Sequence, residues 1–61
     1  MALVTEFITV EINLAVALDL VQTIETRLVQ QGEPLRWAIT QVDNSRQMAT
    51  VEAVVTRTSQ P

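Results

Sequence analysis

The sequence predicts a small α+β domain, in which one helix packs on one face of a three-stranded, mainly antiparallel sheet. The first segment alternates apolar and polar residues, a segment with helical spacing follows, and two further alternating segments flank a short polar turn. This order gives a single β-α-β-β unit. The length of 61 residues leaves room for one domain, residues 1–61.

Residues 3–12 alternate as a strand does, because β-branched residues and threonine recur with a period of two. One predicted face carries Val4, Ile8, Val10 and Ile12, and the other carries Leu3, Thr5, Phe7, Thr9 and Glu11. Glu6 falls on the apolar face by parity. It either lies at the rim of the sheet and reaches water, or it is a buried carboxylate that would mark a site.

Residues 14–31 are predicted to form the helix. Asn13 suits the N-cap, because its side chain can accept a hydrogen bond from the first turn. Gly32 can adopt the left-handed conformation that ends many helices, and Pro34 cannot continue a helix. The apolar stripe consists of Leu14, Ala17, Leu18, Val21, Ile24 and Leu28.

Residues 35–42 and 47–57 are predicted to form a hairpin. A three-residue loop over residues 44–46 matches apolar with apolar and polar with polar across the two strands, whereas a two-residue loop mixes them. The resulting pairs are Ile39 with Val51, Trp37 with Ala53, Leu35 with Val55 and Thr40 with Thr50. We expect Trp37 to face the helix as a core anchor.

The third strand is expected between the other two, which gives the order 1-3-2 with every neighbouring pair antiparallel. The orders 3-2-1 and 2-1-3 are the alternatives, and each would contain a parallel pair. Residues 58–61 are polar and are expected to form a flexible tail.

One helix covers only one face of a sheet, so the second face should be uncovered. A domain of this length rarely holds more than about 3–5 kcal/mol in its own core, and 48% of this chain is hydrophobic. We therefore expect the chain to self-associate as a homo-oligomer, with a different protein partner as an alternative. The candidate oligomer interface is Phe7, Val42, Met48, Val54, Thr40 and Thr50.

Catalytic and cofactor chemistry is not expected. The chain contains no histidine, cysteine, lysine or tyrosine, and its four arginines stay protonated near neutral pH. No catalytic, cofactor-binding or metal residues are predicted, since a zinc site would need carboxylates alone. The net charge of −3 speaks against nucleic acid and against anionic membranes. A cysteine-free chain suits a reducing compartment, so the expected location is cytoplasmic.

The order strand, helix, then a strand carrying Trp37-Ala38-Ile39 and a hairpin back resembles the dodecins in size and arrangement. Dodecins are small oligomeric flavin-binding proteins in which a tryptophan of the second strand stacks the flavin ring. The resemblance implies a small-ligand binder as an alternative function, with Trp37 as the stacking residue. The turn from Asp43 to Arg46 is shorter than the dodecin pattern. An accessory subunit of a larger complex is a further alternative.

Overall fold

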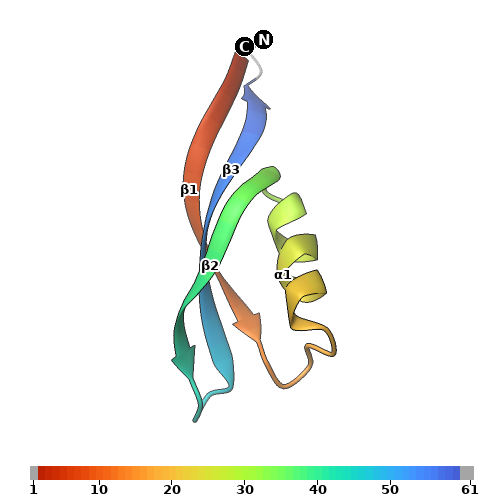
Figure 1. Ribbon diagram of the computed structural model, residues 1–61, viewed down its shortest axis with the longest axis vertical. Coiled ribbons are helices and arrows are strands. Elements are labelled where there is room, and N and C mark those ends of the chain that lie inside the picture. The colour runs from red at the N-terminus through yellow and green to blue at the C-terminus, as the bar shows by residue number, and fades with distance from the viewer. Residues whose placement is uncertain (1, 60–61) are drawn as a thin grey trace.

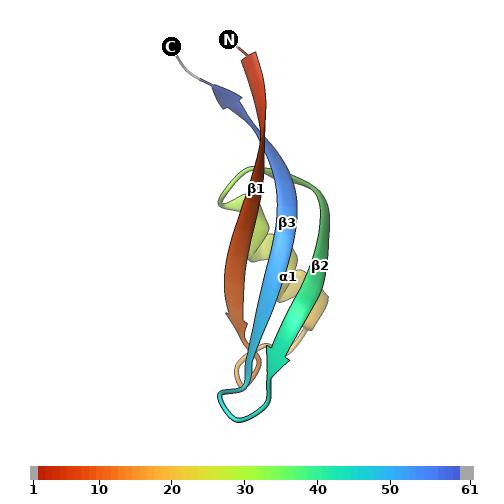
Figure 2. The same cartoon turned by 90° about the vertical axis from the view of Figure 1, so that its left-hand side faces the viewer.

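The computed structural model describes residues 2–59, which form one antiparallel sheet with one helix on one face (Figure 1). The elements are β1 (Ala2–Asn13), α1 (Leu20–Val29), β2 (Glu33–Asp43) and β3 (Met48–Ser59). β3 lies between its neighbours in the order β1-β3-β2, and Figure 2 shows α1 behind this sheet. The predicted fold class and strand order are confirmed.

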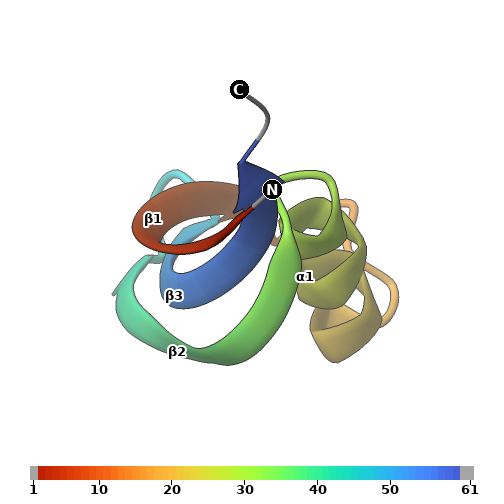
Figure 3. The same cartoon turned by 90° about the horizontal axis from the view of Figure 1, so that it is seen from above.

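The molecule is elongated, with extents of 43 × 18 × 17 Å. β1 and β3 continue past the end of α1 toward the chain termini, where they form a two-stranded ribbon (Figure 1). Seen from above, the strands curve strongly and the helix lies to one side of them (Figure 3). β3 continues to Ser59, so residues 58 and 59 extend a strand that we expected to end at Arg57. Residues 60 and 61 of the expected tail lie outside the described residues.

The core lies between α1 and the sheet. Its buried hydrophobic residues are Val10, Ile12, Ile24, Leu28, Ala49, Val51, Ala53 and Val55. Trp37 packs against this cluster from β2, as predicted, and faces the helix because it pairs with buried Ala53. Fewer helix residues are buried than the stripe predicted, since Leu18 is fully exposed and Val21 is 53% exposed.

The helix begins later than predicted, at Leu20 rather than residue 14. Asn13 is the last residue of β1, and its Oδ1 accepts a hydrogen bond from the Ala15 N–H at 2.9 Å. This is an Asx turn rather than a helix cap. The Leu14 N–H donates to the Gln47 carbonyl at 2.8 Å, which holds the chain at the end of the sheet.

The chain must cross from the end of β1 to the face of the sheet before a helix can run back along it. Residues 14–19 make that crossing. Asp19 then caps α1, because its Oδ1 accepts from the Gln22 N–H at 3.1 Å while its backbone remains extended.

The end of the helix also differs from the prediction. The C-cap is Gln30 in a right-handed conformation, and the Gly32 N–H donates to the Leu28 carbonyl at 3.1 Å. Gly32 has φ of +157°, far from a left-handed helical value. The glycine is needed for space instead, because a Cβ there would lie 2.6 Å from the Thr56 carbonyl oxygen.

The hairpin confirms two predicted pairs, Trp37 with Ala53 and Ile39 with Val51. The loop, however, covers residues 44–47, one residue longer than predicted, because Asp43 pairs with Met48. A register shift at Thr40 compensates for that extra residue, and a second shift lies at Leu35. Thr40 therefore does not pair with Thr50. Likewise Pro34, not Leu35, lies opposite Val55, and Leu35 is 59% exposed.

Asp43 organises the hairpin loop. Its Oδ1 accepts from the Ser45 hydroxyl at 2.8 Å, from the Ser45 N–H at 3.1 Å and from the Arg46 N–H at 3.2 Å. These donors favour the charged carboxylate, so the Ser45 hydroxyl above all lowers the pKa of Asp43 below its ordinary value.

The pKa of Asp43 makes the contribution of the loop depend on pH. A carboxyl whose pKa is lower in the folded chain stabilises the fold above its unfolded pKa, and loses that effect as the pH falls through the folded value. We expect Asp43→Ala to lower the urea midpoint at pH 7. The difference in urea midpoint between this variant and the unaltered chain should become smaller below about pH 4. The matched control is Asn44→Ala in the same loop, which should show no such pH dependence. A gap of constant size from pH 7 to about pH 2.5 would contradict this role of the charge.

Candidate interaction surface

The sheet has an outer face, defined as the face turned away from α1. Side chains of the central strand alternate, so buried Val51, Ala53 and Val55 face the helix and their neighbours face outward. Directly paired residues of antiparallel strands share a face. The pairs with β3 therefore show which residues of β1 and β2 face outward. The outer face is formed mainly by Leu3, Thr5, Phe7, Thr9, Glu11, Arg36, Ala38, Met48, Thr50, Glu52, Val54 and Thr56.

Five of the six candidate interface residues lie on this outer face. Phe7 pairs with Val54 and is 69% exposed, and Thr50 pairs with Glu11. Met48 pairs with Asn13 at the far end of the sheet. The Thr40 hydroxyl donates to Glu52 Oε2 at 3.2 Å, which brings this bulge residue to the same side.

Val42 is the exception, and its predicted position is wrong. It pairs with Ala49, which is buried on the helix side of the sheet. After the shift at Thr40, every following residue of β2 lies on the face opposite to the one that unbroken alternation predicts. Val42 is 51% exposed, but on the side of the helix rather than on the outer face.

A shallow hollow of about 210 Å³ lies in the outer face. Phe7, Ala38 and Val54 supply its apolar side, and Arg36, Thr40 and Glu52 its polar side. Trp37 and Ala53 also border it, although both residues face the helix by their pairing. Ligand pockets usually measure about 300–1,000 Å³, so this hollow is small for a ligand site. It suits the insertion of a side chain from another surface.

Glu6 lies at the rim, as the first of its two interpretations predicted. It faces the helix side of the sheet by its pairing with Val55. Arg57 Nη2 donates to its Oε2 at 3.0 Å, and the two side chains are 56% and 39% exposed, respectively. No buried charged or polar side chain occurs within residues 2–58, and no group of acidic residues in the described part of the chain is arranged to hold a metal ion.

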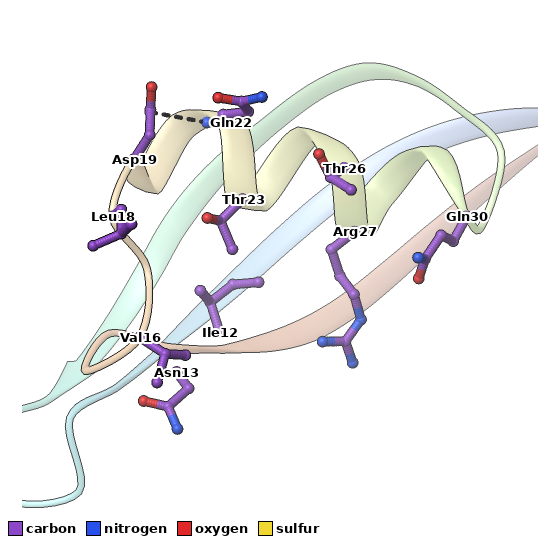
Figure 4. Close-up of a pocket in the computed structure, with 10 residues that line it drawn as sticks. All are labelled: Ile12, Asn13, Val16, Leu18, Asp19, Gln22, Thr23, Thr26, Arg27 and Gln30. Atoms are coloured by element: carbon purple, nitrogen blue, oxygen red, sulfur yellow. Dashed lines mark hydrogen bonds between the residues drawn. The ribbon is translucent and has the colours of Figure 1, made fainter.

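Sequence reasoning missed a groove of about 580 Å³ between α1 and the end of β1 (Figure 4). Thr23, Arg27 and Gln30 point from the helix toward β1, while Val16 and Leu18 line the groove from the connecting segment. Arg27 Nη1 donates to the Glu11 carbonyl at a long 3.4 Å. Its polar lining consists of amides, hydroxyls, the Arg27 guanidinium and the Asp19 carboxylate, and that carboxylate already accepts the N-cap hydrogen bond from Gln22.

Leu3 is the outer-face residue that the candidate set omitted. It is 76% exposed, more than any other large apolar residue of the sheet. The signal was present in the sequence, because Leu3 has the same parity in the first strand as Phe7.

The fold and this surface define a small α+β protein whose single antiparallel sheet is covered on one side only. The chain belongs to the family described as Domain of unknown function (DUF8621), whose model matches residues 6–57. No curated protein and no solved structure matches it. The helix α1 is too short to cross a membrane, and the described residues contain no other helix.

Proposed function

We propose that this chain is a non-enzymatic module that associates with copies of itself through the outer face of its sheet. The observation that carries the proposal is the bare outer face, on which Leu3 and Phe7 are 76% and 69% exposed. Burying such side chains is favourable, and a small core leaves the chain with little stability of its own.

The total accessible surface supports the same proposal. The chain of 6.8 kDa exposes 4448 Å². A self-contained monomer of this mass exposes roughly 4,000 Å². The elongated ribbon and the uncovered sheet leave more surface open than a monomer usually does, and a partner is the usual means of covering it.

Trp37 gives no support to flavin stacking on the outer face. Its side chain lies on the helix side of the sheet, against the core. The order of elements implied by the dodecin resemblance is present, but the stacking surface that it implied is turned inward. Self-association needs no ligand and is the function that this geometry favours.

Val54→Glu tests the proposal. Val54 lies at the centre of the outer face, opposite both Phe7 and Arg36, so a carboxylate there would be desolvated in an assembly but tolerated in a free chain. We expect the unaltered chain to show a multiple of its monomer mass by light scattering at micromolar concentration, and Val54→Glu to show a smaller mass with unchanged circular dichroism.

The matched control is Val29→Glu, which makes the same change at a helix position that is 63% exposed and away from the outer face. It should keep the assembly. A monomeric unaltered chain would contradict self-association and would favour a different protein as the partner. An assembly that survives Val54→Glu would place the contact elsewhere.

A further inference from the structure

The two edges of the sheet differ in their ability to accept another strand. β2 carries Pro34 and two register shifts, at Leu35 and Thr40. Proline and bulges on an edge strand prevent pairing with a further chain. β1 pairs with β3 without any shift from Ala2 to Asn13. It contains no proline and no lysine, so β1 is the open edge.

Backbone contacts show which residues of β1 turn toward this edge. The Glu11 carbonyl accepts from Arg27 and so points away from β3, whereas the Leu14 N–H points toward the Gln47 carbonyl before β3. In an antiparallel strand, each residue directs its N–H and its C=O to the same side, and successive residues alternate between the two sides. The odd-numbered residues from Leu3 to Glu11 therefore direct theirs outward. Arg27 covers this edge at Glu11, and residues 3–7 lie farther along the strand, toward its N-terminal end.

We propose that residues 3–7 of β1 pair with the same segment of a second copy, antiparallel and about a two-fold axis at Thr5. This inference rests on the proposed self-association and adds a second contact to it, at the edge of the sheet rather than on the outer face. The two sheets then join into one of six strands, with both helices on the same side. The axis at Thr5 places Leu3 opposite the partner's Phe7, twice in the symmetric pair. These are the two most exposed large apolar side chains of β1.

Charge selects this register over its neighbours. An axis at Glu6 would set two carboxylates directly opposite each other, which is unfavourable. An axis at Phe7 would set Leu3 opposite the partner's Glu11 and would bring the partner under Arg27. With the axis at Thr5, each Glu6 instead lies opposite the partner's Val4. Val4 pairs with Arg57 within each sheet, so the partner's Arg57 lies in the same row of residues across the strands.

Cysteine cross-linking tests the register, because the chain has no cysteine of its own. Paired Cα atoms in a hydrogen-bonded antiparallel pair lie about 5.5 Å apart, which a disulfide spans. We expect Thr5→Cys to form covalent dimers under mild oxidation about tenfold faster than Thr9→Cys, a matched change at the same edge and on the same face. Thr9 and its copy would lie roughly 27 Å apart in this pairing.

Proline substitution at the same two positions is the second measurement. The Thr5 N–H bonds to no neighbour within the described chain if it faces the open edge, so Thr5→Pro should keep the circular dichroism and weaken association by about tenfold or more. Thr9→Pro should weaken it far less. The cross-linking result decides the question if either proline variant fails to fold.

The outcomes separate this pairing from the proposal on which it rests. A monomeric mass for the unaltered chain overturns both. An assembly in which Thr5→Cys cross-links no faster than Thr9→Cys overturns the β1 pairing alone, and leaves self-association through the outer face standing.

Discussion

Leu28→Ala is expected to unfold most of the chain at 25 °C. Leu28 and Ile24 are fully buried, and they are the two buried residues of α1. Truncating a buried leucine to alanine costs about 2–5 kcal/mol, because the core loses contacts and retains a cavity. A domain of this size rarely has more than about 3–5 kcal/mol to lose.

Urea unfolding followed by circular dichroism, at one fixed protein concentration, measures this loss. Val29→Ala is the matched control, because Val29 is the next residue and is 63% exposed. It should change the free energy of unfolding by less than about 0.5 kcal/mol. A loss below about 1 kcal/mol for Leu28→Ala would mean that α1 contributes little to the core.

Gly32→Ala is expected to have the second largest effect. The new methyl group would lie 2.6 Å from the Thr56 carbonyl oxygen and 3.3 Å from the Val55 side chain. The carbonyl belongs to the central strand and cannot move without disturbing the sheet. The φ of +157° is also unfavourable for alanine. We expect a loss of about 1–3 kcal/mol.

The urea midpoint of Gly32→Ala should therefore fall, and Gln31→Ala should leave it almost unchanged. Gln31 is exposed and adjoins Gly32. Equal midpoints for the two variants would show that the connection from α1 to β2 can shift away from β3 at little cost.

The two edge strands, β1 and β2, differ in the features that allow a further strand to pair with them. β1 offers a regular backbone, whereas Pro34 and the two shifts interrupt β2. An assembly that used β2 would have to accommodate those irregularities, and one that used β1 would not. The outer face and the β1 edge adjoin at Leu3 and Phe7, and a copy paired at the edge leaves the outer face open to a further copy.

The fold class, the strand order and the faces of most residues could be predicted from the order and spacing of residues alone. Alternation placed Val4, Ile8, Val10 and Ile12 on the helix side, and the pairing of Trp37 with Ala53 followed from matching apolar residues across the hairpin. Alternation also put Phe7, Met48, Thr50 and Val54 of the candidate interface on the outer face. The period of two is a property of the backbone, and it needs no knowledge of distant contacts.

The start of the helix, the face of Val42 and the need for glycine at residue 32 could not be predicted in this way. Each depends on a contact between segments that are far apart in the sequence. The Leu14 N–H meets the Gln47 carbonyl, and this delays the helix. A longer loop combined with the shift at Thr40 turns Val42 over. The Thr56 carbonyl leaves no space for a side chain at residue 32. Local propensity does not contain such contacts, because they exist only once the chain has packed.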